Sequence, residues 1–180
     1  MGAVASETPP LPVALAEVKA FLRISVSDED ALLAGLVRAA ADLCEAFTGR
    51  ALIERAVEEM VAASTARIRL NAGPVRSIDG VAAIDEAGEA TALAAGNYAA
   101  EIDAGGEGWV RLLAAADTQR LRVAYRVGMA ADWNGVPEML RHGVVRLAAQ
   151  YYLRRGETGE VEVPAAVTAL WRPWRRLRLK

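Results

Sequence analysis

The sequence predicts an α+β protein, in which a small helical bundle carries an inserted antiparallel β module and an extended C-terminal tail. Near both ends of the 180-residue chain, apolar residues recur at steps of three and four, which is typical of helices packed on one face. Through the middle of the chain, apolar residues alternate with polar ones, which is typical of half-buried strands. A chain of this length is expected to form one domain, or one domain with an insertion.

The first part of the chain is predicted to form an arm followed by two helices. Residues 1–12 hold three prolines and are expected to form a flexible N-terminal arm. The first helical part is expected over residues 13–50, and its opening helix over residues 14–22. Ser27 is the predicted N-cap of a second, longer helix, which Gly49 ends. Close to the positive end of its dipole, that helix would carry three acids, Asp28, Glu29 and Asp30.

Residues 51–128 are assigned to the inserted β module. Local signals conflict over residues 51–63, where alanine and glutamate favour helix although a glycine has just ended one. From residue 66 onward, short alternating segments are separated by turn residues. The last of these segments, residues 121–127, alternates apolar side chains with Arg122 and Arg126. This regular spacing of short strands predicts a small antiparallel sheet.

A second helical part and a tail complete the chain. A helix over residues 136–156 is predicted by an apolar stripe, by Pro137 as a first helical residue and by Gly156 as a stop signal. Residues 157–180 are expected to form a loop, a short helix that starts at Pro164, and a basic tail. The last nine residues carry five positive charges and no negative one.

The sequence lacks the patterns of an enzyme. The single histidine, His142, falls on the polar face of a predicted helix, without a second histidine or a nucleophile motif. The single cysteine, Cys44, lies in an apolar stripe and is expected to be buried, and one cysteine excludes an intramolecular disulfide and a cysteine-rich metal site. The glycines within residues 105–108 precede a strand rather than a helix, so they predict a turn and not a phosphate-binding loop. We therefore expect no catalytic residue, no cofactor and no metal.

A series of motifs runs in order through residues 13–172, and the series resembles the head-to-tail connector (adaptor) proteins of long-tailed phages and of phage-derived gene transfer agents. The motifs come from the helical start, from the middle of the β module, and from the last strand with the helix that follows it. In chain order they are Val13–Ile24, Asp28–Leu33, Ala39–Arg50, Leu70, Gly73–Ile78, Asp85–Gly88, Asn97–Tyr98, Tyr125–Gly128, Val136–Leu140 and Val144–Arg155.

The resemblance implies a strand over residues 56–61 and a structural function. It implies a ring of about twelve subunits that sits under the portal protein and continues the DNA channel. The lower surface of the ring would receive a tail-completion or stopper protein. Double-stranded DNA would pass without sequence-specific binding, which the net charge of -2 permits. Phage and gene transfer agent remain equal alternatives for the particle.

The C-terminal tail is the predicted portal-binding segment, because tryptophan beside arginine is typical of interface anchors. We expect this tail to be loosely ordered in the free protein, so that truncation after Ala169 would leave thermal stability nearly unchanged. The predicted portal-binding residues are Leu170, Trp171, Arg172, Trp174, Arg175, Arg176, Leu177 and Arg178.

The alternative function is a nucleic-acid-binding module that uses the same tail. Aromatic and basic side chains together can stack on bases and neutralise phosphates. No apolar segment is long enough to span a bilayer, and no signal peptide is recognisable. The protein is therefore expected in the cytoplasm until it joins the neck of a particle.

Overall fold

The computed structural model describes residues 4–5, 12–115, 118–155 and 163–176. The chain divides into two compact units. Residues 1–9 and 53–129 form a β unit, and residues 10–52 and 130–180 form a helical unit. The described residues form four α-helices and two antiparallel sheets, which confirms the predicted α+β class.

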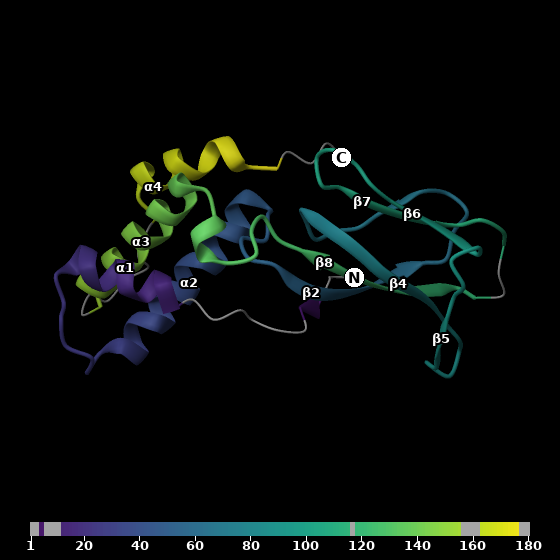
Figure 1. The fold of residues 1–180 in the computed structure, drawn as a ribbon, viewed down its shortest axis with the longest axis horizontal. Coiled ribbons are helices and arrows are strands. Elements are labelled where there is room, and N and C mark those ends of the chain that lie inside the picture. The colour runs from purple at the N-terminus through teal and green to yellow at the C-terminus, as the bar shows by residue number, and fades with distance from the viewer. Residues whose placement is uncertain (1–3, 6–11, 116–117, 156–162, 177–180) are drawn as a thin grey trace. The chain divides into compact units, whose positions relative to one another are not determined.

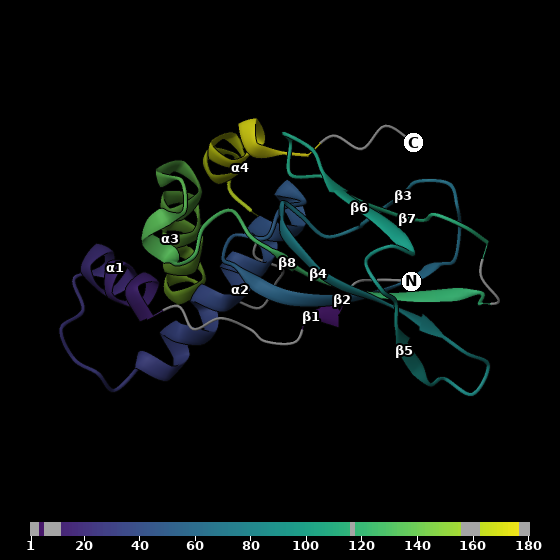
Figure 2. The ribbon, with the colours of Figure 1, turned by 45° about the vertical axis from the view of Figure 1, so that its right-hand side comes forward.

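The helical unit is built around helix α3. Helices α1 (Pro12–Leu22), α2 (Asp30–Thr48) and α4 (Ala165–Trp171) all contact α3 (Glu138–Leu153). Two short 3-10 turns, η1 (Trp133–Gly135) and η2 (Arg172–Trp174), precede α3 and follow α4 (Figures 1 and 2). The apolar stripes predicted from the sequence meet in one core, to which the unit contributes Val18, Leu33, Val37, Cys44, Leu140, Val144, Leu147 and Trp171.

The start of α2 differs from the prediction that Ser27 caps it. The N-cap residue is Glu29, which makes no side-chain capping hydrogen bond, and the backbone oxygen of Ser27 accepts from the N–H of Asp30 at 3.1 Å. The acids near this end instead serve contacts between helices. Asp30 forms an ion pair with Lys19 of α1 at 2.6 Å, and Glu29 accepts a hydrogen bond from the hydroxyl of Tyr152 on α3. Tertiary partners have replaced the local cap.

The other helix ends agree more closely with the sequence. Gly49 follows α2 in the left-handed conformation with φ 69°, and its N–H donates to Glu45 at 2.8 Å, as a terminating glycine should. Pro137 is the N-cap of α3 rather than its first helical residue, because its ψ of 134° is extended. The predicted stop signal, Gly156, lies outside the described residues.

The β unit contains two packed sheets where the sequence predicted one. The larger sheet has the order β1-β2-β8-β4-β5 and the smaller one the order β3-β7-β6, with antiparallel neighbours throughout (Figures 1 and 2). The predicted strands over 56–61 and 121–127 are confirmed as β2 and β8. The strands are β1 (Val4–Ala5), β2 (Arg55–Ala62), β3 (Ile68–Arg69), β4 (Val75–Ile84), β5 (Ala90–Ala92), β6 (Tyr98–Ile102), β7 (Gly108–Leu112) and β8 (Arg120–Val127).

Part of the predicted flexible arm is a strand. Val4 and Ala5 pair with Glu58 and Val57 at the edge of β2. Residues 1–3 and 6–11 of that arm lie outside the described residues. The arm therefore includes at least one short segment with defined backbone partners.

The two ends of the β unit lie side by side. A side chain at Gly128, which follows β8, would come within 2.5 Å of the Cα of Glu54, which precedes β2, so glycine is required for this close approach. In the helical unit, Ala130 donates its N–H to the backbone oxygen of Leu52 at 3.2 Å. The chain thus leaves and re-enters the helical unit at neighbouring backbone positions.

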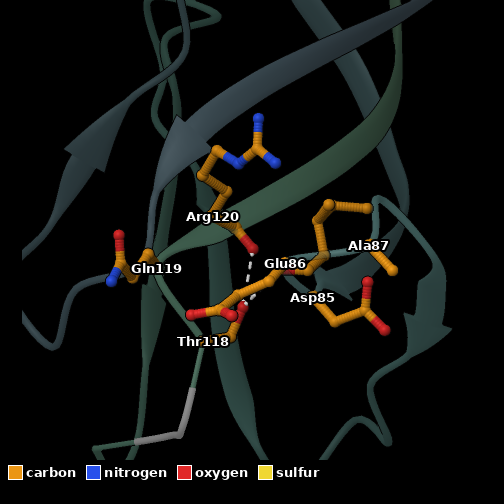
Figure 3. Close-up of a pocket in the computed structure, with 7 residues that line it drawn as sticks. Asp85, Glu86, Ala87, Thr118, Gln119 and Arg120 are labelled. Carbon is orange, nitrogen blue, oxygen red and sulfur yellow. Dashed lines mark hydrogen bonds between the residues drawn. The ribbon is translucent and has the colours of Figure 1, made fainter.

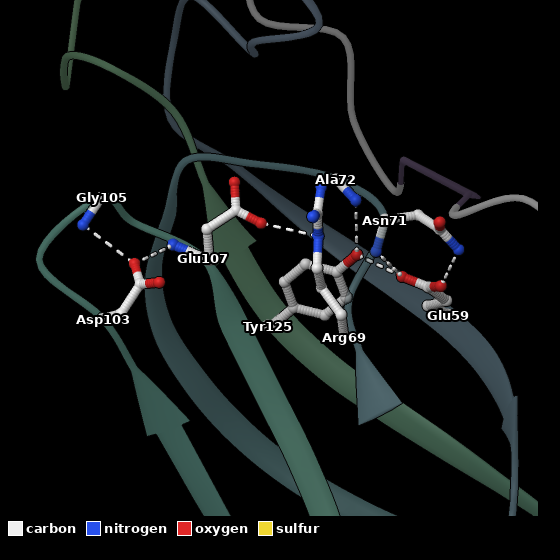
Figure 4. Close-up of polar contacts among 8 residues, drawn as sticks. All are labelled: Glu59, Arg69, Asn71, Ala72, Asp103, Gly105, Glu107 and Tyr125. Atoms are coloured by element: carbon white, nitrogen blue, oxygen red, sulfur yellow. Dashed lines mark hydrogen bonds and ion pairs between the residues drawn. The ribbon is translucent and has the colours of Figure 1, made fainter. Parts of the chain in front are cut away.

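The core of the β unit contains one buried carboxylate, Glu59, which is 1% exposed on the inward face of β2. It accepts hydrogen bonds from the Tyr125 hydroxyl at 2.7 Å, from the Asn71 N–H at 2.9 Å, and from the Asn71 side-chain amide (Figure 4). The Tyr125 oxygen in turn accepts from the N–H of Ala72 at 3.3 Å. A buried charge is tolerated only when hydrogen bonds satisfy it, and these bonds hold the loop between β3 and β4.

We expect Glu59→Gln to destabilise the protein by about 1.5–3 kcal/mol, the typical range for hydrogen bonds to a charged group. A neutral amide accepts more weakly, and its own N–H group would face donors. Chemical denaturation measures the change. The matched control is Glu58→Gln on the exposed face of the same strand, which should shift the unfolding free energy by less than about 0.5 kcal/mol. Equal effects of the two substitutions would contradict the role of the network.

Candidate functional site

The predicted C-terminal segment contains one residue that belongs to the core. Trp171 is fully buried, and its Nε1 donates to the backbone oxygen of Leu140 at 3.4 Å. Its ring lies beside that of Phe47, with centroids 6.0 Å apart. The expectation that Trp171 is exposed and waits for a partner is therefore wrong. Because truncation after Ala169 would remove this buried side chain, we now expect that truncation to destabilise the protein.

A glycine on α3 makes room for this tryptophan. A Cβ atom at Gly143 would collide with Nε1 of Trp171 and would lie 2.9 Å from its Cδ1 and Cε2 atoms. Gly143 is itself buried in the middle of α3, where glycine costs helix stability relative to alanine. The Gly143 notch thus positions α4 and the turn that follows it.

After Trp171 the chain turns back onto the C-terminal end of α2. The N–H of Arg176 donates to the backbone oxygen of Thr48 at 2.7 Å, and Nε of Arg50 donates to the backbone oxygen of Trp174 at 3.0 Å. The guanidinium of Arg175 lies over the Phe47 ring, 5.7 Å from its centroid. Turn η2 and the two residues after it are therefore held at the end of α2 by hydrogen bonds and a cation–π contact rather than being loosely ordered.

The result is a basic surface at the carboxyl end of a helix. We call Arg172, Arg175 and Arg176 the C-terminal basic surface; the first two are exposed and the third is half-buried. Positive charge is stabilised there by the negative end of the α2 dipole. A shallow depression beside it is lined by Phe47, Thr168 and Pro173 together with the first two arginines. Of the other predicted portal-binding residues, Leu170 and Trp174 are half-buried, and Leu177 and Arg178 lie outside the described residues.

A second, open depression lies in the β unit, where strand β4 ends and strand β8 begins. Figure 3 shows Asp85, Glu86 and Arg120 around it. The hydroxyl of Thr118 donates to the backbone oxygens of Ile84 and Arg120 at 2.9 and 3.0 Å, which closes the end of the sheet. This end is polar and solvent-exposed, and its residues form no pair of nucleophile and base.

The single histidine and the single cysteine have the exposure and burial that the sequence predicted. His142 is exposed on α3, whereas Cys44 is fully buried in α2. Burial, with a smaller contribution from the charge of Glu45, raises the pKa of the Cys44 thiol from 9.0 to about 12. No group of three metal-ligating side chains occurs in the described parts of the chain. No helix among these residues is long and apolar enough to cross a membrane.

Replacement of two helical glycines by alanine should change stability in opposite directions, because only Gly143 makes room for Trp171. Gly143→Ala should destabilise the protein by about 1–3 kcal/mol, because the new methyl group displaces Trp171. Gly35→Ala in α2, where the nearest atom to a new Cβ lies 3.9 Å away, should instead stabilise it by up to ~1 kcal/mol. Thermal unfolding of the two variants measures both effects. A Gly143→Ala protein as stable as wild type would show that α4 does not depend on the notch.

The raised pKa of Cys44 predicts a loss of stability at high pH. In the unfolded chain the thiol ionises near pH 9.0, whereas in the folded protein it stays protonated up to about pH 12. Its contribution is therefore fully present below pH 9.0 and is lost as the pH rises toward 12. Cys44→Ala should cost on the order of 1 kcal/mol at neutral pH and should remove this part of the decline. Parallel pH curves for the two proteins in urea denaturation would contradict the assignment.

Comparison with known proteins gives a match to one family over part of the chain. Residues 12–94 match the family described as phage gp6-like head-tail connector protein, which is a structural and not an enzymatic family. A search of curated protein sequences gave no significant match. Among solved structures, several chains match, and three of the most similar come from gene transfer agent (GTA) particles.

These three likenesses extend over the whole chain. One is to a chain in the neck of an empty GTA particle computed with C6 symmetry, with 27% identity, a TM-score of 0.82, and coverage of 100% of this chain and 98% of that one. A second is to a chain in the virion of a native GTA particle, with 29% identity, a TM-score of 0.81 and the same coverage. The third is to a chain in the neck of a native GTA particle computed with C12 symmetry, with 29% identity, a TM-score of 0.74, and coverage of 98% and 97%. By sequence, the chain is therefore similar to the phage gp6-like head-tail connector family over residues 12–94, and by fold it is similar to chains of GTA particles over nearly its whole length.

Proposed function

We propose that this protein is the head-to-tail adaptor in the neck of a GTA or phage particle, where twelve copies form a ring under the portal protein. The observation that carries the proposal is its end-to-end similarity to a neck chain from a particle computed with C12 symmetry. A ring of identical subunits needs the same heterologous contact at every junction. The ring extends the DNA channel and offers its other side to a tail-completion or stopper protein.

The C-terminal basic surface is the proposed portal contact. Its exposed arginines can form paired hydrogen bonds with carboxylates, and the fixed turn η2 holds them at defined positions. Because Trp171 is buried, its part in this contact is to position the segment rather than to touch the portal. Each single contact is weak, but twelve of them on one portal act together through multivalency.

The alternative, a nucleic-acid-binding module, is less well supported by the same segment. Stacking on bases requires an exposed aromatic ring, and Trp171 is fully buried while Trp174 is half-buried. The net charge of -2 also provides no general attraction to phosphates. An adaptor ring requires only that DNA pass, which does not need a binding site on each subunit.

Charge reversal tests the proposed portal contact. We expect Arg172→Glu with Arg175→Glu to abolish co-purification with portal and to leave DNA-filled heads without tails. Stability should fall by only about 1 kcal/mol, since one ring contact with Phe47 is lost. The matched control, Arg38→Glu with Arg146→Glu, makes the same charge change at exposed positions of α2 and α3 and should leave assembly intact.

Two results would count against this assignment. Normal portal binding by the Arg172→Glu, Arg175→Glu protein would show that the portal contact lies elsewhere. Binding of the wild-type protein to duplex DNA that falls steeply with added salt, and that the same two substitutions remove, would favour the nucleic-acid-binding module.

A further inference from the structure

Strand β6 has a row of backbone hydrogen-bonding groups for which the described residues provide no partners. It is the end strand of the smaller sheet, in the order β3-β7-β6. The bonds from Leu113 to Asn97 at 3.0 Å and from Asp103 to Glu107 at 3.0 Å show which residues face β7. Because this orientation alternates along an antiparallel strand, Tyr98, Ala100 and Ile102 direct their N–H and C=O groups away from the sheet.

Strand β6 itself lacks several of the features that usually block the addition of another strand. It contains no proline, lysine or arginine, and no bulge interrupts its pairing with β7. Its one charged residue, Glu101, faces β7 with its backbone and pairs its side chain with Arg67 at 2.7 Å. Ile102, at the end of the edge, is 41% exposed. An open edge of this kind is a template for an added strand.

Strand β5 of the same chain is almost fully exposed to solvent. All three residues of β5 are exposed, as are Asp85–Ala90 at the turn before it. Figures 1 and 2 show this β4–β5 hairpin projecting from the rest of the β unit. The bonds from Asp85 to Glu89 and from Leu93 to Val81 orient the hairpin, so the backbone groups of Ala90 and Ala92 point away from β4. Alanine side chains would let another strand approach closely.

We propose that β5 of one subunit pairs with the open edge of β6 in the next subunit of the ring. The proposal rests on the proposed ring function and names one of its subunit contacts. The contact joins two different surfaces of the same chain, which is the heterologous type that a closed ring requires. It satisfies the free groups of Tyr98, Ala100 and Ile102 with those of Ala90 and Ala92.

Charge favours the same pairing. The hairpin carries the acids Asp85, Glu86 and Glu89, and no basic residue lies between Asp85 and Ile102. The face of the smaller sheet beside β6 carries Arg67, Arg69 and Arg111; the first two pair with Glu101 and Glu107 at 2.7 and 2.6 Å. The half-buried Arg111 has no ion pair or side-chain hydrogen bond within the described parts of the chain, so an acid of the neighbouring hairpin could pair with it.

Cysteine pairs in assembled particles test the proposal. Particles are produced with the full-length Ala92→Cys, Ala100→Cys protein, oxidised, and analysed on a denaturing gel without reductant. Pairing between successive subunits predicts a ladder that continues beyond dimers. The native Cys44 is fully buried with a raised pKa, so it stays silent. Each single cysteine variant should give monomers only.

The matched control moves the second cysteine to an exposed position in a different strand, away from β6. Ala62, at the end of β2, is exposed, so the Ala92→Cys, Ala62→Cys protein should remain monomeric on the gel. Particles that contain the Ala92→Cys, Ala100→Cys protein but show no cross-link would overturn the proposal, as would a ladder only with Ala62→Cys. Cross-linking that stops at dimers would indicate a symmetric pair and would also overturn it. Absence of the wild-type protein from particles would instead contradict the proposed function.

Discussion

The helical unit depends on the insertion of Trp171 against Gly143. Without a side chain at Gly143, the indole can lie against α3 and hydrogen-bond to the backbone of Leu140. This contact fixes α4, and α4 in turn delivers turn η2 to the end of α2, where Arg176 and Trp174 bond to Thr48 and Arg50. The position of the C-terminal basic surface is therefore a consequence of core packing one helical turn earlier. A large buried aromatic side chain supplies the free energy that orders a segment too short to fold alone.

In the β unit, apolar side chains form the core, whereas polar side chains determine the paths of the loops. Alternation along β2 and β8 places Val57, Val61, Val123 and Val127 inward and explains the common core. One inward position holds Glu59 instead of an apolar residue, and its hydrogen bonds determine the path of the loop after β3. Asp103 orders the turn before β7 in the same way, by accepting from the N–H groups of Gly105 and Glu107 (Figure 4). Polar side chains thus shape the loops, while apolar ones hold the sheets together.

Features that depend on local pattern could be predicted from the sequence. The strand of residues 121–127, the helix that Gly49 ends and the burial of Cys44 follow from periodicity and from glycine geometry. The prediction that Ser27 caps α2 was wrong because Lys19 and Tyr152, which are distant in sequence, bind the acids that follow Ser27. The prediction that Trp171 is exposed was wrong for a similar reason, since only the folded chain brings Gly143 into contact with the Trp171 ring. The second sheet was missed because alternation identifies strands without saying which strands pair.

The adjacency of the two crossing points between units has an evolutionary consequence. Ala130 bonds to the backbone of Leu52, and Gly128 lies against Glu54, so the β unit begins and ends at one place. Insertions are best tolerated where the ends of the inserted segment are close together, because the host fold then needs no rearrangement. Changes in the length or structure of the β unit should therefore leave the core of the helical unit intact. Related particles could in this way diversify one part of their neck subunits and conserve the other.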